Sequence, residues 1–125
     1  MDDAKINQWL DDYVAAWISY DPQAVGKLFS EDARCYFGPY DEPVEGREAI
    51  VANWLKNRDE PGTYDAKYRL VVRQDGLAVT NGRSVYYEKG TKNVHREFDN
   101  IFLIRFDSAG QATEFREWFM EKRKS

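Results

Sequence analysis

Apolar and polar positions follow different patterns in the two halves of the chain. Near the N-terminus, apolar side chains recur every three or four positions, the spacing that places them on one face of a helix. The positions that form this stripe are Ile6, Trp9, Leu10, Tyr13, Val14, Trp17 and Ile18. We therefore predict a long amphipathic helix at the N-terminus.

Two shorter helices and one short strand are predicted next. Asp21 and Pro22 supply a helix cap and a first-turn proline, which predicts a helix that runs to about Phe29. Residues 32–37 end in aromatic side chains and precede a loop rich in Gly, Pro and Asp, so we interpret them as a strand. Gly46 opens a third helical pattern, in which the predicted inward positions are Ile50, Trp54 and Leu55.

From Thr63 onward the pattern has a period of two, which is typical of strands that bury one face. Asp75-Gly76 predicts a two-residue hairpin turn. The predicted strands are residues 63–74, 77–88, 94–107 and 111–121. Together these elements predict an α+β fold, in which three helices pack on one face of a curved, mostly antiparallel sheet.

Length and charge limit what the protein can be. The chain has 125 residues, which fits one domain over residues 1–125. It has 22 acidic and 18 basic residues, and a net charge of −4 argues against nucleic-acid binding through phosphates. With one cysteine (Cys35), one histidine and no phosphate-binding loop, we expect no disulfide, no metal site and no cofactor. The lack of a long apolar run or signal peptide predicts a cytoplasmic protein without membrane association.

The strand patterns bring a carboxylate and an amide together on the face that the helices cover. A turn at Ser108-Ala109 predicts three pairs across the last two strands: Phe98 with Phe119, Asn100 with Glu117, and Phe102 with Phe115. Glu117 and Asn100 are therefore expected to meet between two pairs of aromatic rings.

The preceding strand is expected to add a guanidinium to this pair. Its more apolar positions, which we assign to the inner face, are Leu77, Val79, Asn81, Arg83, Val85 and Tyr87. A tight turn at Gly90-Thr91 then sets Asn81 opposite Asn100 and Arg83 opposite Phe98. We expect Arg83 to converge with Asn100 and Glu117 on the concave side of the sheet.

Two interpretations of this polar cluster remain open. A Glu117 carboxyl among phenylalanine rings has a raised pKa, since burial disfavours its charged form, and such a group suits general acid or base catalysis. Alternatively, Glu117 and Arg83 form a buried ion pair that Asn100 bridges, which organises a core and catalyses nothing.

Several stretches carry a resemblance over nearly the whole chain. They are Asp21-Pro-Gln-Ala-Val25, Leu28-Phe-Ser-Glu-Asp-Ala33, Glu45-Gly-Arg-Glu-Ala-Ile50, Asn100, Ile104-Arg-Phe-Asp107, Gly110 and Glu114-Phe-Arg-Glu-Trp118. These stretches, with the order of elements, resemble the nuclear transport factor 2-like superfamily in its SnoaL-like branch. The resemblance implies a cone-shaped, cystatin-like roll. It implies no single reaction, because the superfamily includes isomerases, epoxide hydrolases, dehydratases, polyketide cyclases and non-catalytic binders.

The resemblance to ketosteroid isomerases of this superfamily is incomplete at the functional positions. Tyr13 matches their oxyanion-binding tyrosine on the first helix. Phe37 stands where they have the general-base Asp, and Phe102 stands at or near their second carboxylic acid. Steroid isomerisation with that set of residues is therefore not expected.

Two further branches match only in part. Glu117 resembles the last-strand Asp of limonene epoxide hydrolases and Arg83 could stand for their Arg, but Val85 replaces their second carboxylate. SnoaL-type cyclases rely on a His and an Asp, and alternation places His95 on the outer face of the sheet.

The combined prediction is a protein that binds a small, largely apolar molecule in an aromatic-lined cone and performs cofactor-free acid/base chemistry. The reaction would be of the isomerase, hydrolase, dehydratase or cyclase type. Tyr13 is the predicted hydrogen-bond donor, Glu117 the acid or base, and Arg83 and Asn100 the orienting groups. The predicted pocket residues are Trp17, Phe37, Trp54, Phe98, Phe102, Phe115 and Phe119. The alternative is a non-catalytic dimeric module that stores an apolar ligand or binds a protein partner.

The outer face of the sheet is predicted to form an interface. Its apolar positions are Ile101, Leu103, Trp118 and Met120. A patch of this kind is too apolar to be left in water, so we expect a homodimer through the sheet.

Overall fold

The computed structural model describes residues 1–124, which form three helices and a six-stranded sheet. The helices are α1 (Asp3–Ser19), α2 (Pro22–Lys27) and α3 (Arg47–Lys56). The strands are β1 (Phe29–Tyr36), β2 (Val44–Glu45), β3 (Tyr64–Gln74), β4 (Leu77–Tyr87), β5 (Val94–Phe106) and β6 (Ala112–Glu121). Their order in the sheet is β2-β1-β6-β5-β4-β3, and only the β1–β6 pair is parallel in this part of the chain. The predicted α+β class and the antiparallel meander are confirmed.

The predicted start of α2 is confirmed by its cap, and α1 also has a side-chain cap. A carboxylate oxygen of Asp2 accepts a hydrogen bond from the backbone N–H of Lys5 at 2.8 Å, and Asp21 caps α2 in the same manner. The predicted end of α2 was two residues too late. Leu28 is the C-cap of α2, and its carbonyl accepts from the N–H of Ala112 at 2.9 Å, so that β1 begins at the next residue, Phe29.

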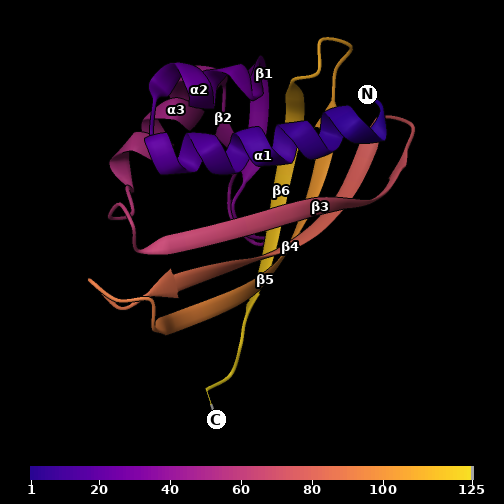
Figure 1. Ribbon diagram of the computed structural model, residues 1–125. Helices are drawn as coiled ribbons and strands as arrows, with labels where there is room; N and C mark the ends of the chain where they lie inside the picture. Colours follow the sequence, from indigo (N-terminus) through magenta and orange to yellow (C-terminus); the bar gives the residue numbers. More distant parts are fainter. Residues whose placement is uncertain (125) are drawn as a thin grey trace.

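The helices cover one face of a strongly curved sheet (Figure 1). α1 lies across the sheet and contacts β3, while α2 and α3 pack beside β1. Beneath the N-terminal half of α1 the core is fully packed. Its completely buried side chains include Leu10, Phe29, Ile104 and Phe115. No helix within residues 1–124 is long and apolar enough to cross a membrane.

The face assigned to β4 was wrong by one residue. Its inner positions are small or polar: Ala78, Thr80, Gly82 and Ser84, followed by Tyr86. Gly82, rather than Asn81, lies opposite Asn100, because β4 and β5 are joined by a longer loop and a bulge at Tyr86/Tyr87. A side chain at position 82 would collide with the carbonyl of Lys67 and the ring of Tyr68. Aromatic rings from neighbouring elements fill the space that larger β4 side chains would need.

The register predicted between β5 and β6 was wrong by two residues. Asn100 lies opposite Phe119, and Glu117 lies opposite Phe102. The turn is longer than predicted, with the N–H of Asp107 bonded to the carbonyl of Gln111 at 2.9 Å, and a bulge interrupts the ladder at Arg105/Phe106. A shift of two residues preserves the face, so Asn100 and Glu117 still lie on the concave side as diagonal neighbours.

Candidate functional site

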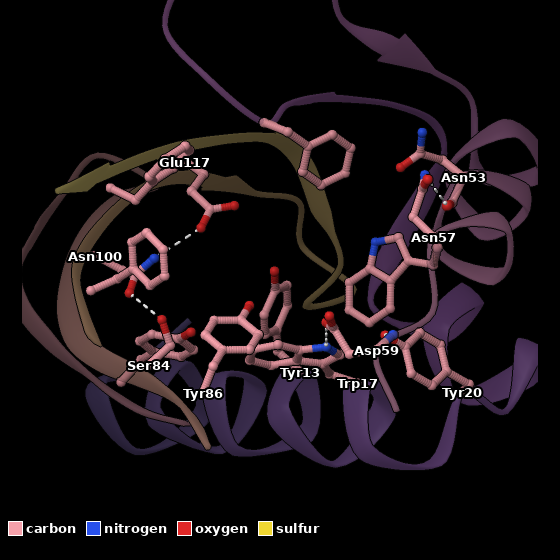
Figure 2. Close-up of a pocket in the computed structure, with 15 residues that line it drawn as sticks. Tyr13, Trp17, Tyr20, Asn53, Asn57, Asp59, Ser84, Tyr86, Asn100 and Glu117 are labelled. Carbon is pink, nitrogen blue, oxygen red and sulfur yellow. Dashed lines mark hydrogen bonds between the residues drawn. The ribbon is translucent and has the colours of Figure 1, made fainter. Parts of the chain in front are cut away.

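A cavity of about 310 Å³ opens beside the C-terminal half of α1 (Figure 2). Its walls come from α1, α3, the loop after α3 and the inner faces of β3 to β6. The aromatic lining consists of Tyr13, Trp17, Tyr20, Phe37, Trp54, Tyr68, Tyr86, Phe98 and Phe119. The polar lining consists of Asn53, Asn57, Asp59, Ser84, Asn100 and Glu117.

A chain of hydrogen bonds holds the Glu117 carboxyl at one side of this cavity. The Ser84 hydroxyl donates to Oδ1 of Asn100 at 2.9 Å, and Nδ2 of Asn100 donates to Oε2 of Glu117 at 2.9 Å. Figure 2 shows the three side chains in this order. Oε1 of Glu117 accepts no hydrogen bond from residues 1–124. Asn100 thus orients one carboxyl oxygen, and the other is left for a ligand.

The surroundings of Glu117 tune its protonation. Burial raises the pKa of this carboxyl to about 7, and the hydrogen bond from Asn100 opposes part of that rise. At neutral pH the carboxyl is therefore present both as acid and as base. A group in this state can take up a proton from a ligand or give one to it.

Tyr13 supplies a second polar group to the same cavity. Its ring is clamped in the core, 5.5 Å from the ring of Phe115 and 5.0 Å from that of Trp54. Tyr13 is only 8% exposed, yet its hydroxyl makes no hydrogen bond within residues 1–124. Burial, and secondarily the charge of Glu117, raises the pKa of this phenol, so it remains a neutral hydrogen-bond donor.

The opposite side of the cavity holds a second carboxylate. Nε1 of Trp17 donates to Oδ2 of Asp59 at 3.0 Å, and the N–H of Asp59 donates to the hydroxyl of Tyr20 at 2.8 Å. Tyr20 caps α1 in the left-handed conformation, with φ of 50°, which is uncommon for a residue with a side chain. The loop after α3 is therefore fastened to the end of α1 at Asp59.

Most of the predicted site residues come together around this cavity. Those that line it are Tyr13, Trp17, Phe37, Trp54, Phe98, Asn100, Glu117 and Phe119. Phe102 and Phe115 do not line it. Both are buried in the core, at 1% and 0% exposure, because the ring of Tyr13 packs on each of them and separates them from the cavity.

Arg83 is not part of the site. Its side chain is 73% exposed on the outer face of β4, where its guanidinium lies 3.6 Å from the Glu97 carboxylate. The reason is the one-residue error in the face of β4, which turns every side chain of the strand over. The alternative interpretation, a buried Arg83–Glu117 ion pair, is therefore wrong, and Ser84 takes the place beside Asn100 that Arg83 was expected to fill.

Several lining residues were missed from the sequence. They are Tyr20, Asn53, Asn57, Asp59, Tyr68, Ser84 and Tyr86. The correct face of β4 would have identified Ser84 and Tyr86. Asn57 and Asp59 lie in an irregular loop, where no periodic pattern marks the inward side. Cys35 is buried, as expected of a small apolar side chain, and burial raises the pKa of its thiol.

Comparison with known proteins places the chain among relatives of the same shape. The family model for the SnoaL-like domain matches residues 10–115. Among functionally curated proteins, nothing matches the chain significantly.

Two solved structures are similar over nearly the whole chain. An NTF-2-like protein of unknown function from Burkholderia xenovorans LB400 has a TM-score of 0.71 at 19% identity, covering 98% of this chain and 88% of that one. A candidate ketosteroid isomerase from Kribbella flavida DSM 17836 has a TM-score of 0.70 at 14% identity, covering 99% of this chain and 84% of that one. At these identities the similarity establishes the fold.

Proposed function

The chain belongs to the SnoaL-like domain family, and from this premise we propose that it binds a small, largely apolar molecule and transfers protons on it without a cofactor. The reaction is of the isomerase, hydrolase, dehydratase or cyclase type. The observation that carries the proposal is the Glu117 carboxyl, which faces an aromatic cavity with a pKa of about 7 and one oxygen free. The cytoplasmic location of the protein stays a prediction.

The roles follow from what each side chain can donate or accept. Glu117 removes a proton from carbon or oxygen of the ligand, or returns one, while the hydrogen bond from Asn100 holds its Oε2 and leaves Oε1 available. Ser84 fixes the amide of Asn100 in turn. The hydroxyl of Tyr13 has no partner within the described residues. It donates a hydrogen bond to a ligand oxygen that develops negative charge during the reaction.

In this proposal the proton is transferred by a different carboxyl group from those in the ketosteroid isomerase pattern. The positions matched to the two acids of those enzymes hold Phe37 and Phe102. Phe37 lines the cavity and Phe102 lies buried beneath it. The proton-transferring group is then Glu117 on β6, beside Asn100 in a largely aromatic cavity.

The proposal is tested with 2-tetralone, a compact aromatic ketone with acidic α-protons. We expect the protein to accelerate exchange of these protons for deuterium, measured by NMR, and the rate to follow a group with a pKa of about 7. Glu117→Gln keeps shape and should lower the rate by roughly 10²- to 10⁴-fold. Quenching of tryptophan fluorescence serves as the binding control, because Trp17 and Trp54 line the cavity. Equal exchange rates for wild type and Glu117→Gln would refute the role of Glu117.

A non-catalytic dimeric binder is the second candidate, and the outer face of the sheet favours it. Ile101, Trp118 and Met120 are exposed there, with Met120 at 75%. We propose that a second copy of the chain covers this patch, because the charges around it are already paired within one chain, as in Arg105–Glu114. Binding of 2-tetralone without proton exchange favours the binder. A monomer in sedimentation at tens of micromolar contradicts the dimer.

A further inference from the structure

The carboxylate of Asp59 is held rigidly at the cavity without a counter-ion. Its backbone N–H is bound to Tyr20 and its Oδ2 to Trp17, so both ends of the residue are fixed. Its Oδ1 accepts no hydrogen bond, and Asp59 takes part in no ion pair within residues 1–124. A half-buried charge in such a place is stabilised best by a partner that arrives with a ligand.

Aromatic rings surround this carboxylate. Trp17, Tyr20 and Tyr86 line the cavity together with Asp59, and the rings of Trp17 and Tyr86 lie 6.1 Å apart at 60° to each other. Figure 2 shows Asp59, Trp17 and Tyr20 on one side of the cavity and Glu117 with Asn100 on the other. Trp17 and Tyr20 contact Asp59 through polar groups, the indole N–H and the hydroxyl. An alkylammonium group paired with Oδ1 of Asp59 would therefore lie among aromatic rings, which attract such cations.

The cavity lining contains no Lys, Arg or His in the described part of the chain. Three basic side chains approach from outside, of which His95 and Arg96 line a neighbouring surface hollow together with Asp59 and Tyr86. Arg96 lies over the ring of Phe98, but its guanidinium donates two hydrogen bonds to the carboxylate of Glu121, at 2.8 and 2.9 Å. Arg58 lies over the ring of Tyr20, 5.5 Å from its centroid, and does not line the cavity. With two carboxylates and no cation among its walls, the cavity disfavours anionic ligands.

We propose that the natural ligand carries an alkylammonium group, which binds between Asp59 and the rings of Trp17, Tyr20 and Tyr86. Its apolar body then extends across the cavity, and its far end reaches Glu117 and the unpartnered hydroxyl of Tyr13. This inference rests on the proposed function, since it names the class of molecule that the same cavity takes. It assigns substrate selection to Asp59 and proton transfer to Glu117.

A purely structural role for Asp59 makes a different prediction. In that case the carboxylate only fastens the loop after α3 to Trp17, and its charge is irrelevant. Asp59→Asn separates the two roles, because the asparagine oxygen still accepts from Nε1 of Trp17 while the negative charge is lost.

The experiment compares three probes that share one ring system and differ in charge: 2-naphthylmethylammonium, 2-naphthylmethanol and 2-naphthoate. Their affinities for the full chain are measured at pH 7.5 by tryptophan fluorescence. We expect the ammonium probe to bind about fivefold more tightly than the alcohol, and the carboxylate most weakly. Asp59→Asn should lower the affinity for the ammonium probe about tenfold and the affinity for the alcohol less than about twofold. Arg58→Gln removes a competing cation and should therefore raise the affinity for the ammonium probe.

The outcomes separate this inference from the proposed function. If the alcohol binds as tightly as the ammonium probe, or if Asp59→Asn weakens both equally, the ammonium site is refuted while the apolar cavity stands. If none of the probes binds the wild-type protein, both the ammonium site and the proposed ligand-binding function are contradicted. The alcohol affinity of Asp59→Asn also reports on its folding, because an unfolded variant would bind no probe.

Discussion

The two halves of α1 cover two regions that are equally aromatic and otherwise unlike. Under the N-terminal half, Trp9 packs edge-on against Phe29 and Phe106, and its Nε1 donates to the carbonyl of Leu28 at 3.0 Å. Under the C-terminal half, Tyr13 borders the cavity and its hydroxyl has no partner within residues 1–124. One region is a filled core, and the other is a site.

The difference shows that aromatic content does not distinguish a core from a pocket. The placement of polar groups does, because the cavity wall carries six polar side chains and the hydroxyl of Tyr13. In the filled region, Thr80 is the one buried side chain of the described residues whose polar atom lacks a partner. In the filled region the polar atom of Trp9 is satisfied by the protein itself. In the open region, Tyr13 and one oxygen of Glu117 are not.

The largest contrast is expected from removing a ring on each side. Phe115 is completely buried in the filled region, so Phe115→Ala should lower the free energy of unfolding by about 3–5 kcal/mol. Phe119 lines the cavity and is 56% exposed, so Phe119→Ala should cost less than about 1 kcal/mol. Urea denaturation measures both. Equal losses would mean that the cavity region is packed as tightly as the core.

Glu117 should make the stability of the open region depend on pH. Because the folded pKa is raised from 4.5 to about 7, the folded state holds its proton more tightly than the unfolded state. The contribution of Glu117 to the free energy of unfolding is greatest below about pH 4.5. It declines as the pH rises to about 7 and is constant above that pH. Above pH 7, Glu117→Gln should be more stable than wild type by up to about 3 kcal/mol.

Glu121 on the same strand is the matched control for this measurement. It is exposed, and the hydrogen bond from Arg96 lowers its pKa, so Glu121→Gln should not remove the decline between pH 4.5 and 7. Thermal melts across this range test both variants. If the stability of Glu117→Gln still declines between pH 4.5 and 7, other groups cause the decline.

The smallest expected contrast concerns two tyrosine hydroxyls. The hydroxyl of Tyr64 donates to the carbonyl of Trp17 at 2.7 Å, so Tyr64→Phe should lose about 1 kcal/mol of unfolding free energy. The hydroxyl of Tyr13 has no such bond in the described structure, and Tyr13→Phe should change stability by less than about 0.5 kcal/mol. If Tyr13→Phe is the more destabilising variant, an internal partner holds its hydroxyl and the site contains one donor fewer.

The sequence was sufficient for the three helices and five of the six strands, but not for the two-residue strand β2 or for the start of β1 at Phe29 rather than at residue 32. Of the two predicted strand registers, only the one between β5 and β6 kept the correct faces. The period of two places Asn100 and Glu117 on the concave face, and the two-residue error between β5 and β6 left that face unchanged. The one-residue error between β4 and β5 exchanged Ser84 for Arg83. Odd and even errors in register have opposite consequences, because side chains alternate along a strand.

The failure at β4 has a physical cause that composition conceals. The more apolar face of this strand, with Val79 and Val85, points outward, while small and polar residues point inward. Inward volume is supplied by Tyr68 and Phe102 from the neighbouring strands, whose rings lie 4.6 Å apart. A single strand read by itself does not contain that information. The same holds for Asp59, whose inward position depends on contacts from α1.

The row of small side chains on β4 also has an evolutionary consequence. Of Ala78, Thr80, Gly82 and Ser84, it is Ser84 that reaches the cavity, and β4 is paired with a strand on each side along most of its length. The capacity of the cavity can therefore be rescaled by single codon changes at position 84, with the backbone left in place. Related sequences can thus differ in the size of this cavity while they keep the same scaffold.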